Sequence, residues 1–322
     1  MALKICFTSC ADQINDPVQR GWTFISGKSA DILLLLGDQI YMDYGFGNGH
    51  MSLGMPRSLS LREFSEAMYR RYRAQYEVPS FRQAISRPTT YAIWDDHDFA
   101  WNNARGGASS NGGTTSGHDV VPPDKRLLSR ALFQQFRETL VAKPAKYPPN
   151  PVTNGIVTED LGGIQSTVNC SHLVRLHLLD GRSFRERPAS GGTHLGLHQR
   201  ENLERALISP PGINIIVSST TLKDWKKYSD YRWLRDWGRT HRILVLSGDI
   251  HEPDFRIHET VFEATASAIA QPPGVTAILG KQSEVFGVLS IDDSSIEVEI
   301  YAADRRDEHY EIDRARWSCN AM

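Results

Sequence analysis

The sequence Arg242-Ile-Leu-Val-Leu-Ser-Gly-Asp-Ile-His251 joins a short apolar run to a glycine and two residues that can bind metal. The β-branched and Leu residues predict a buried strand. A loop held by such a strand can present the oxygen of Asp249 and the imidazole of His251 to a metal ion. Taken alone, a capping aspartate and a surface histidine explain the loop equally well.

Three more predicted strands end in residues of the same chemical kind. The run 30–38 ends in Gly-Asp38, the run 90–98 ends in three carboxylates around a histidine, and the run 4–10 ends in a thiol. Four buried strands that each end in a metal-capable residue are hard to attribute to chance. Because ligands gather beyond the carboxyl ends of strands in an open α/β sheet, we expect these residues to meet.

The composition is that of an ordinary soluble globular protein. The chain has 322 residues, with 40% hydrophobic and 23% charged residues, which suits one large domain or two modest ones. The net charge of -2 gives no long-range attraction to nucleic acid or anionic membrane. No apolar run approaches the roughly 18 residues of a membrane span. We therefore expect neither a membrane span nor long nucleic acid as a partner.

The first residues and the cysteines bear on the compartment. Residues 1–4 lead directly into a predicted strand, without the pattern of a signal peptide or a twin-arginine leader. Unless a leader has been removed, we expect a cytoplasmic protein. The cysteines are too few and too scattered for a disulfide framework: Cys6, Cys10, Cys170 and Cys319. In a reducing compartment, a thiol at a strand end is better explained as a metal ligand.

The alternation of patterns along the chain predicts a mixed α/β sandwich, with sheets in the middle and helices outside. Strands are expected at 3–8, 31–36, 89–94, 165–170, 173–179, 213–217, 243–246, 260–264, 285–291 and 296–301. Helices are expected between Asp16-Pro17 and Gly27 and at 61–76, 125–141, 197–207 and 230–237. The spacing of the last three strands is typical of antiparallel hairpins.

Several local signals refine this plan. Ser60-Leu-Arg-Glu63 is a capping-box sequence before the helix 61–76, whose Arg and Tyr residues we assign to a solvated face. Residues 44–58 are interpreted as a loop over the site. The Gly- and Ser-rich residues 103–123 are interpreted as a flexible insertion and not as a linker, because similar strands resume after it. We therefore expect one domain over residues 1–322.

The acidic residues at the strand ends exceed what one metal needs: Asp38, Asp95, Asp96, Asp98 and Asp249. Clustered carboxylates repel one another unless cations neutralise them. Two or more metal ions that share a carboxylate would satisfy this charge. Such a centre can hold a phosphate and activate a water for attack on phosphorus.

Two further residues suggest finer chemistry. Tyr41 follows Asp38 by three residues and is most simply a core tyrosine, but a phenolate together with the thiolate of Cys10 favours Fe³⁺ over Mg²⁺. His97 has carboxylates on both sides, which would keep it protonated near neutrality. A cationic histidine can stabilise or protonate a leaving oxygen. The alternative is a structural histidine held by its acidic neighbours.

Residues that could hold a substrate phosphate follow two of these strands. Asp180 could orient Arg182 through a bidentate pair, so that Arg182 binds a phosphate oxygen. A surface salt bridge is an equally good interpretation. Asn102 and Asn103 could bind a metal ion or a phosphate, or could simply form a turn.

These segments together resemble the alkaline phosphatase D (PhoD-like) family of metallophosphoesterases, within the calcineurin-like superfamily. The resemblance rests on Ser9-Cys10, Gly37-Asp-Gln-Ile-Tyr41, Trp94-Asp-Asp-His-Asp98 with Asn102, Leu179-Asp-Gly-Arg-Ser-Phe-Arg185 and Ser247-Gly-Asp-Ile-His251. They keep the family's order and span most of the chain. Weaker similarities are Leu195-Gly-Leu-His-Gln199 and Glu263-Ala-Thr-Ala-Ser267.

The resemblance implies two packed mixed sheets flanked by helices, with the site at one edge. It implies an Fe³⁺ site and neighbouring divalent sites, which hold Ca²⁺ in described members; Mn²⁺, Mg²⁺ and Zn²⁺ are alternatives. The implied iron ligands are Cys10, Asp38 and Tyr41. In superfamily terms Asp96 takes the place of the usual Asn ligand, His97 that of the catalytic histidine, and Asp249 with His251 that of a His-x-His pair.

The expected function is metal-dependent hydrolysis of small phosphate esters, as a phosphomonoesterase, a phosphodiesterase or both. His97 would serve the leaving group, while Arg182 and Asn102 would hold phosphoryl oxygens. The alternatives are a metal-dependent module that binds a phosphorylated ligand without turnover, and a metallonuclease. The near-neutral charge counts against long nucleic acid, since backbone binding needs a basic track. Ala100-Trp101 replaces the Gly-Pro of many relatives, which would reshape the phosphate pocket.

Overall fold

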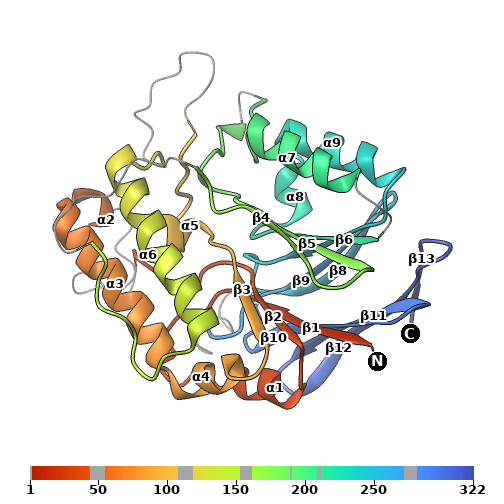
Figure 1. Cartoon of the computed structure of the whole chain (residues 1–322), viewed down its shortest axis with the longest axis horizontal. Helices are drawn as coiled ribbons and strands as arrows, with labels where there is room; N and C mark the ends of the chain where they lie inside the picture. Colours follow the sequence, from red (N-terminus) through yellow and green to blue (C-terminus); the bar gives the residue numbers. More distant parts are fainter. Residues whose placement is uncertain are drawn as a thin grey trace.

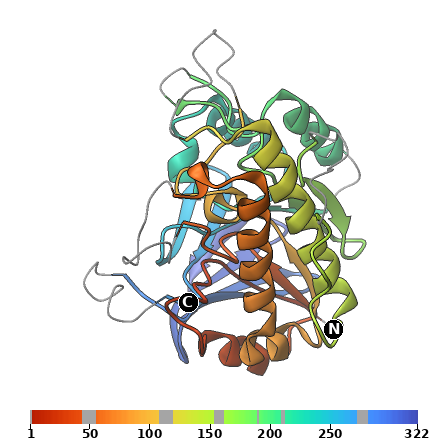
Figure 2. The ribbon, with the colours of Figure 1, turned by 90° about the vertical axis from the view of Figure 1, so that its left-hand side faces the viewer.

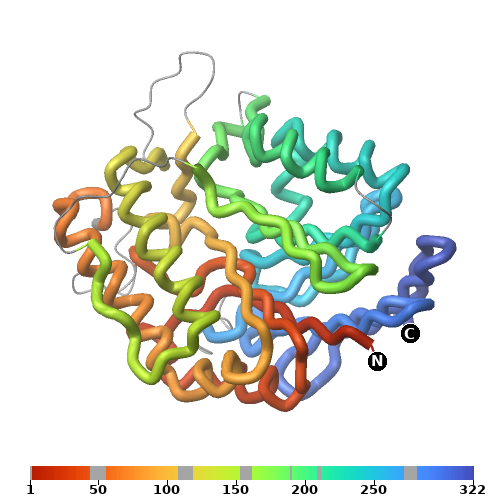
Figure 3. The backbone as a smooth tube through the Cα atoms, viewed as in Figure 1, coloured from red at the N-terminus to blue at the C-terminus, as the bar shows by residue number. Residues whose placement is uncertain are grey.

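The computed structural model describes residues 2–43, 55–107, 119–152, 162–188, 191–208, 212–271 and 281–322. Two β-sheets lie at the centre of the molecule, and helices cover them from outside (Figure 1). The tube in Figure 3 follows the chain through the two sheets. This arrangement confirms the expected α/β sandwich of two mixed sheets flanked by helices.

The larger sheet has seven strands in the order β13-β12-β11-β10-β1-β2-β3. Its strands are β1 (Leu3–Thr8), β2 (Ile32–Leu35), β3 (Thr89–Ala92), β10 (Val285–Ile291), β11 (Ser295–Ala302), β12 (Arg305–Asp313) and β13 (Ser318–Ala321). β1, β2 and β3 are parallel, whereas β10 to β13 are antiparallel.

The smaller sheet has six strands in the order β4-β5-β6-β7-β9-β8. Its strands are β4 (Ser166–Asn169), β5 (Val174–Leu178), β6 (Ile213–Val217), β7 (Ile243–Ser247), β8 (Pro253–His258) and β9 (Val261–Ala266). β5, β6, β7 and β9 are parallel. The antiparallel prediction for the late strands is therefore wrong for β9 against β7, because β8 occupies the hairpin position beside β9.

The helices are α1 (Gly21–Gly27), α2 (Met55–Ser58), α3 (Leu61–Glu77), α4 (Pro79–Ile85), α5 (Asp96–Phe99), α6 (Pro123–Ala142), α7 (Leu197–Leu207), α8 (Leu222–Trp225) and α9 (Ser229–Gly238). In Figure 2, α3 and α6 stand side by side in front of the larger sheet. One apolar core joins the facing sheets to α1, α3, α4 and α6, and a second lies between the smaller sheet and α7 to α9. None of the helices in these described ranges is long and apolar enough to cross a membrane.

Seven elements have no counterpart in the prediction: α2, α4, α5, α8, β8, β12 and β13. The loop predicted for residues 44–58 is therefore wrong at its end, where α2 forms. β12 reads Arg305-Arg-Asp-Glu-His-Tyr-Glu-Ile-Asp313 and carries charge on both faces near the sheet edge, so it lacks the apolar alternation of a strand. The first helix begins only at Gly21, because the Asp16 carboxylate accepts the Gln19 amide in a turn instead of capping the helix.

Two predicted loops lie partly outside the described residues. They are the loop over the site, at 44–54, and the Gly- and Ser-rich insertion, at 108–118. The described ends of that insertion meet: Arg105 and Val120 form an isolated β-bridge, and Arg105 Nε lies 2.5 Å from Asp119 Oδ2. The described residues on either side of the insertion therefore lie next to each other.

Candidate metal centre

Side chains that follow parallel strands of both sheets meet in one buried cluster. Candidate ligand atoms of Asp38, Asp96 and His97 lie within 4.8 Å of one another, and so do those of Asp38, Asp95 and Asp249. Asp38 follows β2, the residues 95–97 follow β3, and Asp249 follows β7. Asp38 belongs to both groups, so its carboxylate has the position of a bridge between two cation sites.

The backbone at these strand ends has an unusual conformation. Cys10, Asp38, Asp249 and His251 have φ angles of 60°, 53°, 75° and 55°. Positive φ is uncommon for residues other than glycine and is often found where function requires a side chain to point in a special direction. Four of the six predicted metal ligands thus have the same left-handed backbone conformation, in three turns that follow β1, β2 and β7.

Glycine is needed in the turn after β2. Gly37 has φ of +110°, and a Cβ atom there would lie 2.7 Å from the Cβ of Asp95. Only glycine lets β2 end this close to the loop that follows β3. The Gly-Asp pair of the sequence therefore has a physical cause: the glycine permits the approach and the aspartate faces the cluster.

The aspartates have unused buried oxygen atoms. Within the described parts of the chain, Asp38 Oδ1, Asp95 Oδ2 and Asp96 Oδ1 are buried and make no hydrogen bond. Buried oxygens nearly always have a hydrogen-bond partner, so three without one in a single cluster are typical of a site that binds cations. Burial, and next the charge of Cys10, raises the pKa of Asp38 well above its usual range. The residues therefore fit metal ions.

The ligands expected for iron also meet. Cys10 Sγ lies 3.5 Å from Asp38 Oδ2, and the Tyr41 hydroxyl hydrogen-bonds with the Cys10 thiol. Burial raises the pKa of Cys10 to about 12, although hydrogen bonds with Ser267, Ser9 and Tyr41 oppose this rise. A thiolate at this place thus needs a cation beside it.

His97 has a partner that sequence reasoning missed. Its Nδ1 lies 2.5 Å from Asp43 Oδ1, and Asp43 is fully buried. Burial disfavours the imidazolium, but the carboxylates of Asp38, Asp96 and Asp43 outweigh it and raise the pKa of His97 well above its usual value. Asp43 lies in the same loop as Asp38, yet nothing in its spacing distinguishes it from a surface aspartate.

Arg182 is buried and has different partners from those predicted. Its Nε lies 2.6 Å from Asp95 Oδ1 and its Nη2 lies 3.5 Å from Asp96 Oδ1. Its Nη1 donates to the Ala104 carbonyl at 3.4 Å. Burial raises the pKa of Asp96, but the charges of Arg182 and His97 outweigh burial and lower this pKa to about 2.

The predicted Asp180–Arg182 side-chain pair is therefore wrong, and so is the surface salt bridge. Asp180 accepts instead from the Trp94 indole at 2.8 Å and from the Ile164 amide at 3.0 Å. It also accepts the backbone amide of Arg182 at 3.0 Å. Asp180 thus shapes the loop that carries Arg182, because a carboxylate that accepts hydrogen bonds from several backbone amides stabilises a tight turn.

The other predicted residues lie at the border of the cluster. Burial, and next the charge of His97, lowers the pKa of His251 to about 4, so its imidazole is neutral, the form that binds metal. Asn102 is exposed, and its backbone amide donates to Asp43 Oδ2 at 2.9 Å. Asp98 accepts the Gln39 amide at 3.0 Å and ties the loops after β2 and β3 together.

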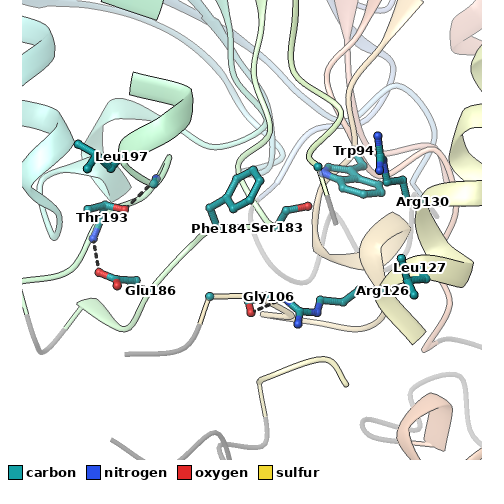
Figure 4. A pocket seen from close by; sticks show the side chains of 13 residues that line it. Trp94, Gly106, Arg126, Leu127, Arg130, Ser183, Phe184, Glu186, Thr193 and Leu197 are labelled. Atoms are coloured by element: carbon teal, nitrogen blue, oxygen red, sulfur yellow. Dashed lines mark hydrogen bonds between the residues drawn. The ribbon is translucent and has the colours of Figure 1, made fainter. Parts of the chain in front are cut away.

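A cavity of about 600 Å³ adjoins this cluster. Trp94 and Ser183, which line it, are the chain neighbours of Asp95 and Arg182. Figure 4 shows Phe184 between these two residues and Leu197, and Arg126 donating to Gly106 on the opposite wall. No predicted site residue lines the cavity, so it borders the centre without containing it.

A protein-family model described as PhoD-like phosphatase matches residues 5–230. A solved structure described as "Structure of PhoD" superposes with a TM-score of 0.66 at 14% identity, covering 100% of this chain and 71% of that one. This likeness shows the fold.

Weaker likenesses reach TM-scores of 0.45 for GAP50, the anchor in the inner membrane complex of Plasmodium, and 0.37 for a predicted phosphoesterase from Streptococcus pneumoniae TIGR4. Their identities are 12% and 10%; the first covers 95% of this chain and 86% of that one, the second 98% and 99%. Scores this low carry no argument. No curated protein sequence matches the chain.

Proposed function

We propose that this chain, which belongs to the PhoD-like phosphatase family of phosphoesterases, is a metal-dependent hydrolase of small phosphate esters. The observation that carries this proposal is the cluster of three buried aspartates, each with a buried oxygen that makes no hydrogen bond, beside the paired His97 and Asp43. Such a cluster costs stability unless cations occupy it, and a buried His–Asp pair serves proton transfer.

In this proposal Cys10, Asp38 and Tyr41 hold Fe³⁺, because thiolate and phenolate ligands donate charge to a trivalent ion. Asp96, Asp249 and His251 would hold divalent ions, and Asp38, which belongs to both groups of candidate ligand atoms, could serve either site. Asp95 joins this set, because its Oδ2 is buried without a hydrogen bond and candidate ligand atoms of Asp38, Asp95 and Asp249 lie within 4.8 Å of one another. Bound ions would polarise the phosphoryl group and make water a better nucleophile.

His97 supplies the proton. Its neighbouring carboxylates keep the imidazole cationic, and Asp43 accepts the hydrogen bond that Nδ1–H donates. Nε2 is then the nitrogen that gives a proton to the leaving oxygen, because Nδ1 is already committed. Asp43 acts through His97: it fixes the orientation of the ring and balances its charge.

Arg182 keeps the aspartates in place and brings a positive charge to the phosphoryl site. Its contacts with Asp95 and Asp96 leave the guanidinium rigid. A rigid cation costs no reorganisation when negative charge develops on a phosphoryl oxygen. Asn102, which is exposed, would reach a second phosphoryl oxygen from the rim of the site.

A substrate assay separates catalysis from mere binding. We expect the purified protein to hydrolyse p-nitrophenyl phosphate, bis-p-nitrophenyl phosphate or both across a panel of metal ions, with metal analysis of the same sample. Asp249→Ala should lower metal occupancy and activity together while the circular dichroism spectrum stays unchanged. A metal-replete protein that binds phosphate but turns over no ester is a binding module, and the hydrolase proposal then fails.

The iron assignment has its own test. The protein as purified should show a visible charge-transfer band that is lost in Tyr41→Phe, because the phenolate is its donor. The control is Tyr69→Phe, a tyrosine whose hydroxyl bonds to the Pro148 carbonyl away from the cluster. A colourless protein with full activity in Mg²⁺ alone would contradict the assignment.

A further inference from the structure

The segment Ser267–Gln271, which follows β9, runs alongside the residues that follow β1. The Ile269 amide donates to the Ser9 carbonyl at 2.9 Å, and the Ala270 amide donates to the Cys10 carbonyl at 3.3 Å. The Asp12 amide donates back to the Ala270 carbonyl at 2.8 Å. These backbone bonds fix the segment against the loop that carries Cys10.

Two side chains of this segment point at the two soft ligands of the proposed iron site. Ser267 Oγ lies 3.2 Å from Cys10 Sγ, and Gln271 Nε2 donates to the Tyr41 hydroxyl oxygen at 2.8 Å. Both side chains are buried. Ala268, between them in the chain, packs against Cys10 and Tyr41. One donor is thus aimed at the sulfur and another at the phenol oxygen.

We propose that Ser267 and Gln271 are positioning residues that set the charge donation of Cys10 and Tyr41 to the metal ion. This inference rests on the proposed iron site. An anionic sulfur or phenolate oxygen is stabilised by a hydrogen bond, and the bond withdraws electron density from it. The ligand then binds as an anion more readily but donates less charge. Outer contacts of this kind tune both affinity and electronic properties of metal sites.

The geometry assigns the direction of each effect. A ligand that donates less charge needs more energy for transfer of an electron to Fe³⁺, so the native hydrogen bonds keep the charge-transfer band at shorter wavelength. Removing the Gln271 donor should move the band to longer wavelength. It should also weaken iron binding, because the anionic oxygen loses a stabilising partner; changes of this kind cost about 10- to 100-fold in metal affinity.

The test compares three variants in the iron-loaded full chain. Gln271→Leu keeps the side-chain bulk and removes the donor, and we expect a shift to longer wavelength per bound iron, with iron affinity measured by chelator competition. Ser267→Ala should produce the same kind of shift, and Ser267→Thr, which keeps the hydroxyl, should restore the native band. Ser283→Ala is the matched control, because Ser283 Oγ accepts from the Gln271 backbone amide and donates to the Gln271 carbonyl, and so contacts the backbone of Gln271 and not its side-chain donor.

The outcomes separate the two proposals. An unshifted band in Gln271→Leu at full iron occupancy overturns the inference and leaves the iron site standing. A wild-type protein without any band removes the iron site and the inference with it. A Ser283→Ala shift as large as that of Gln271→Leu would mean that loosening the segment, and not losing the donor, moves the band, which also overturns the inference.

Discussion

At the scale of single residues, His97 is the side chain with the most distinctive surroundings. It is a buried histidine whose Nδ1 lies 2.5 Å from Asp43, with two further carboxylates close enough to keep it charged. It also belongs to a group of atoms that could hold a metal ion. Its role as an acid and its role as a ligand predict different kinetics.

We expect His97→Ala to lower turnover of an alkyl phosphate ester by about 10²–10⁴-fold, the range for loss of a general acid. The loss on p-nitrophenyl phosphate should be clearly smaller, because p-nitrophenolate is a stable anion without a proton. Asp43→Asn should show the same leaving-group dependence in milder form. Metal content near wild type supports the acid; equal losses on both esters together with lost metal would make His97 a ligand.

His177 allows a prediction about pH that does not involve the metal centre. It is buried on β5, where Nε2 lies 3.0 Å from Asn214 Oδ1 and Nδ1 lies 3.2 Å from Thr167 Oγ1. Burial lowers the pKa of His177 from 6.5 to about 4, although the bond to Asn214 opposes this. The fold therefore favours the neutral imidazole.

Because the folded-state pKa lies below the unfolded-state pKa, this stabilisation is complete above pH 6.5 and is lost as the pH falls to about 4. The loss attributable to His177 should reach roughly 3 kcal/mol of the free energy of unfolding below pH 4, and about 2 kcal/mol of it should fall between pH 7 and pH 5. Denaturant unfolding of wild type and His177→Gln at pH 7 and pH 5 measures it. The variant should lose less stability between these two values, and parallel losses would show that other groups are responsible.

At the scale of elements, the sequence pattern of α3 predicted the start of the helix correctly but predicted its exposed face only in part. The capping box is present: Ser60 and Glu63 exchange both hydrogen bonds at the start of the helix. The solvated face is confirmed for Arg62, which pairs with Glu66 on the surface. It is wrong for Tyr72, which is fully buried and whose hydroxyl lies 3.3 Å from Asp98. A tyrosine has an apolar ring that can be buried if its hydroxyl finds a partner.

The turn after β2 is the element on which the centre most depends. Gly37→Ala would place a methyl group 2.7 Å from the Cβ of Asp95 at a φ of +110°. We expect roughly 1–3 kcal/mol of strain and a loss of metal content, because Asp38 and Asp95 would move apart. Gly27→Ala is the matched control, since a methyl group there has nothing within 4 Å. Thermal unfolding and metal analysis of both variants check this, and equal behaviour would contradict it.

At the scale of the whole molecule, the candidate centre joins the two sheets. Asp38 and Asp95 follow strands of the larger sheet, whereas Asp249 follows β7 of the smaller sheet. Without cations these carboxylates repel one another across the interface. Burial, with Asp95 and Asp96, raises the pKa of Asp249 to about 7, which reflects that repulsion. Metal ions should therefore stabilise the fold as well as the site.

We expect metal ions to raise the melting temperature of the wild type. At a metal concentration of 100 times the Kd, they should add about 2.7 kcal/mol to the free energy of unfolding. The variant Asp38→Asn should depend less on metal ions for its stability. Metal-free, it should melt higher than the metal-free wild type, because one buried negative charge has gone; metal ions should then add little. Calorimetry of both proteins with and without chelator measures this. If the metal-free variant were less stable than the metal-free wild type, the Asp38 carboxylate would stabilise the fold through protein contacts, and the prediction would be wrong.

The sequence alone determined the class of the fold, the family and the positions where metal-capable residues end the strands. Apolar runs that stop at Gly-Asp or at a cluster of carboxylates are local features, and parallel strands bring their carboxyl ends to one edge of a sheet whatever the details of packing. Cys10, Asp38, Asp96 and Asp249 could therefore be found without coordinates. The charged strands β8, at the edge of the smaller sheet, and β12, beside the edge strand β13, could not, because their positions depend on pairing and not on an apolar face.

The tertiary structure decided which side chains touch. Asp43 meets His97 across 54 residues, Arg182 meets Asp95 across 87, and Ser267 meets Cys10 across 257. Each of these contacts joins loops from different strands, and the last two join loops from the two different sheets. These residues are polar and follow no periodic pattern in the sequence, so their contacts could not be predicted from it. The packing of one sheet on the other buries them, and each buried polar group then requires a hydrogen-bond partner.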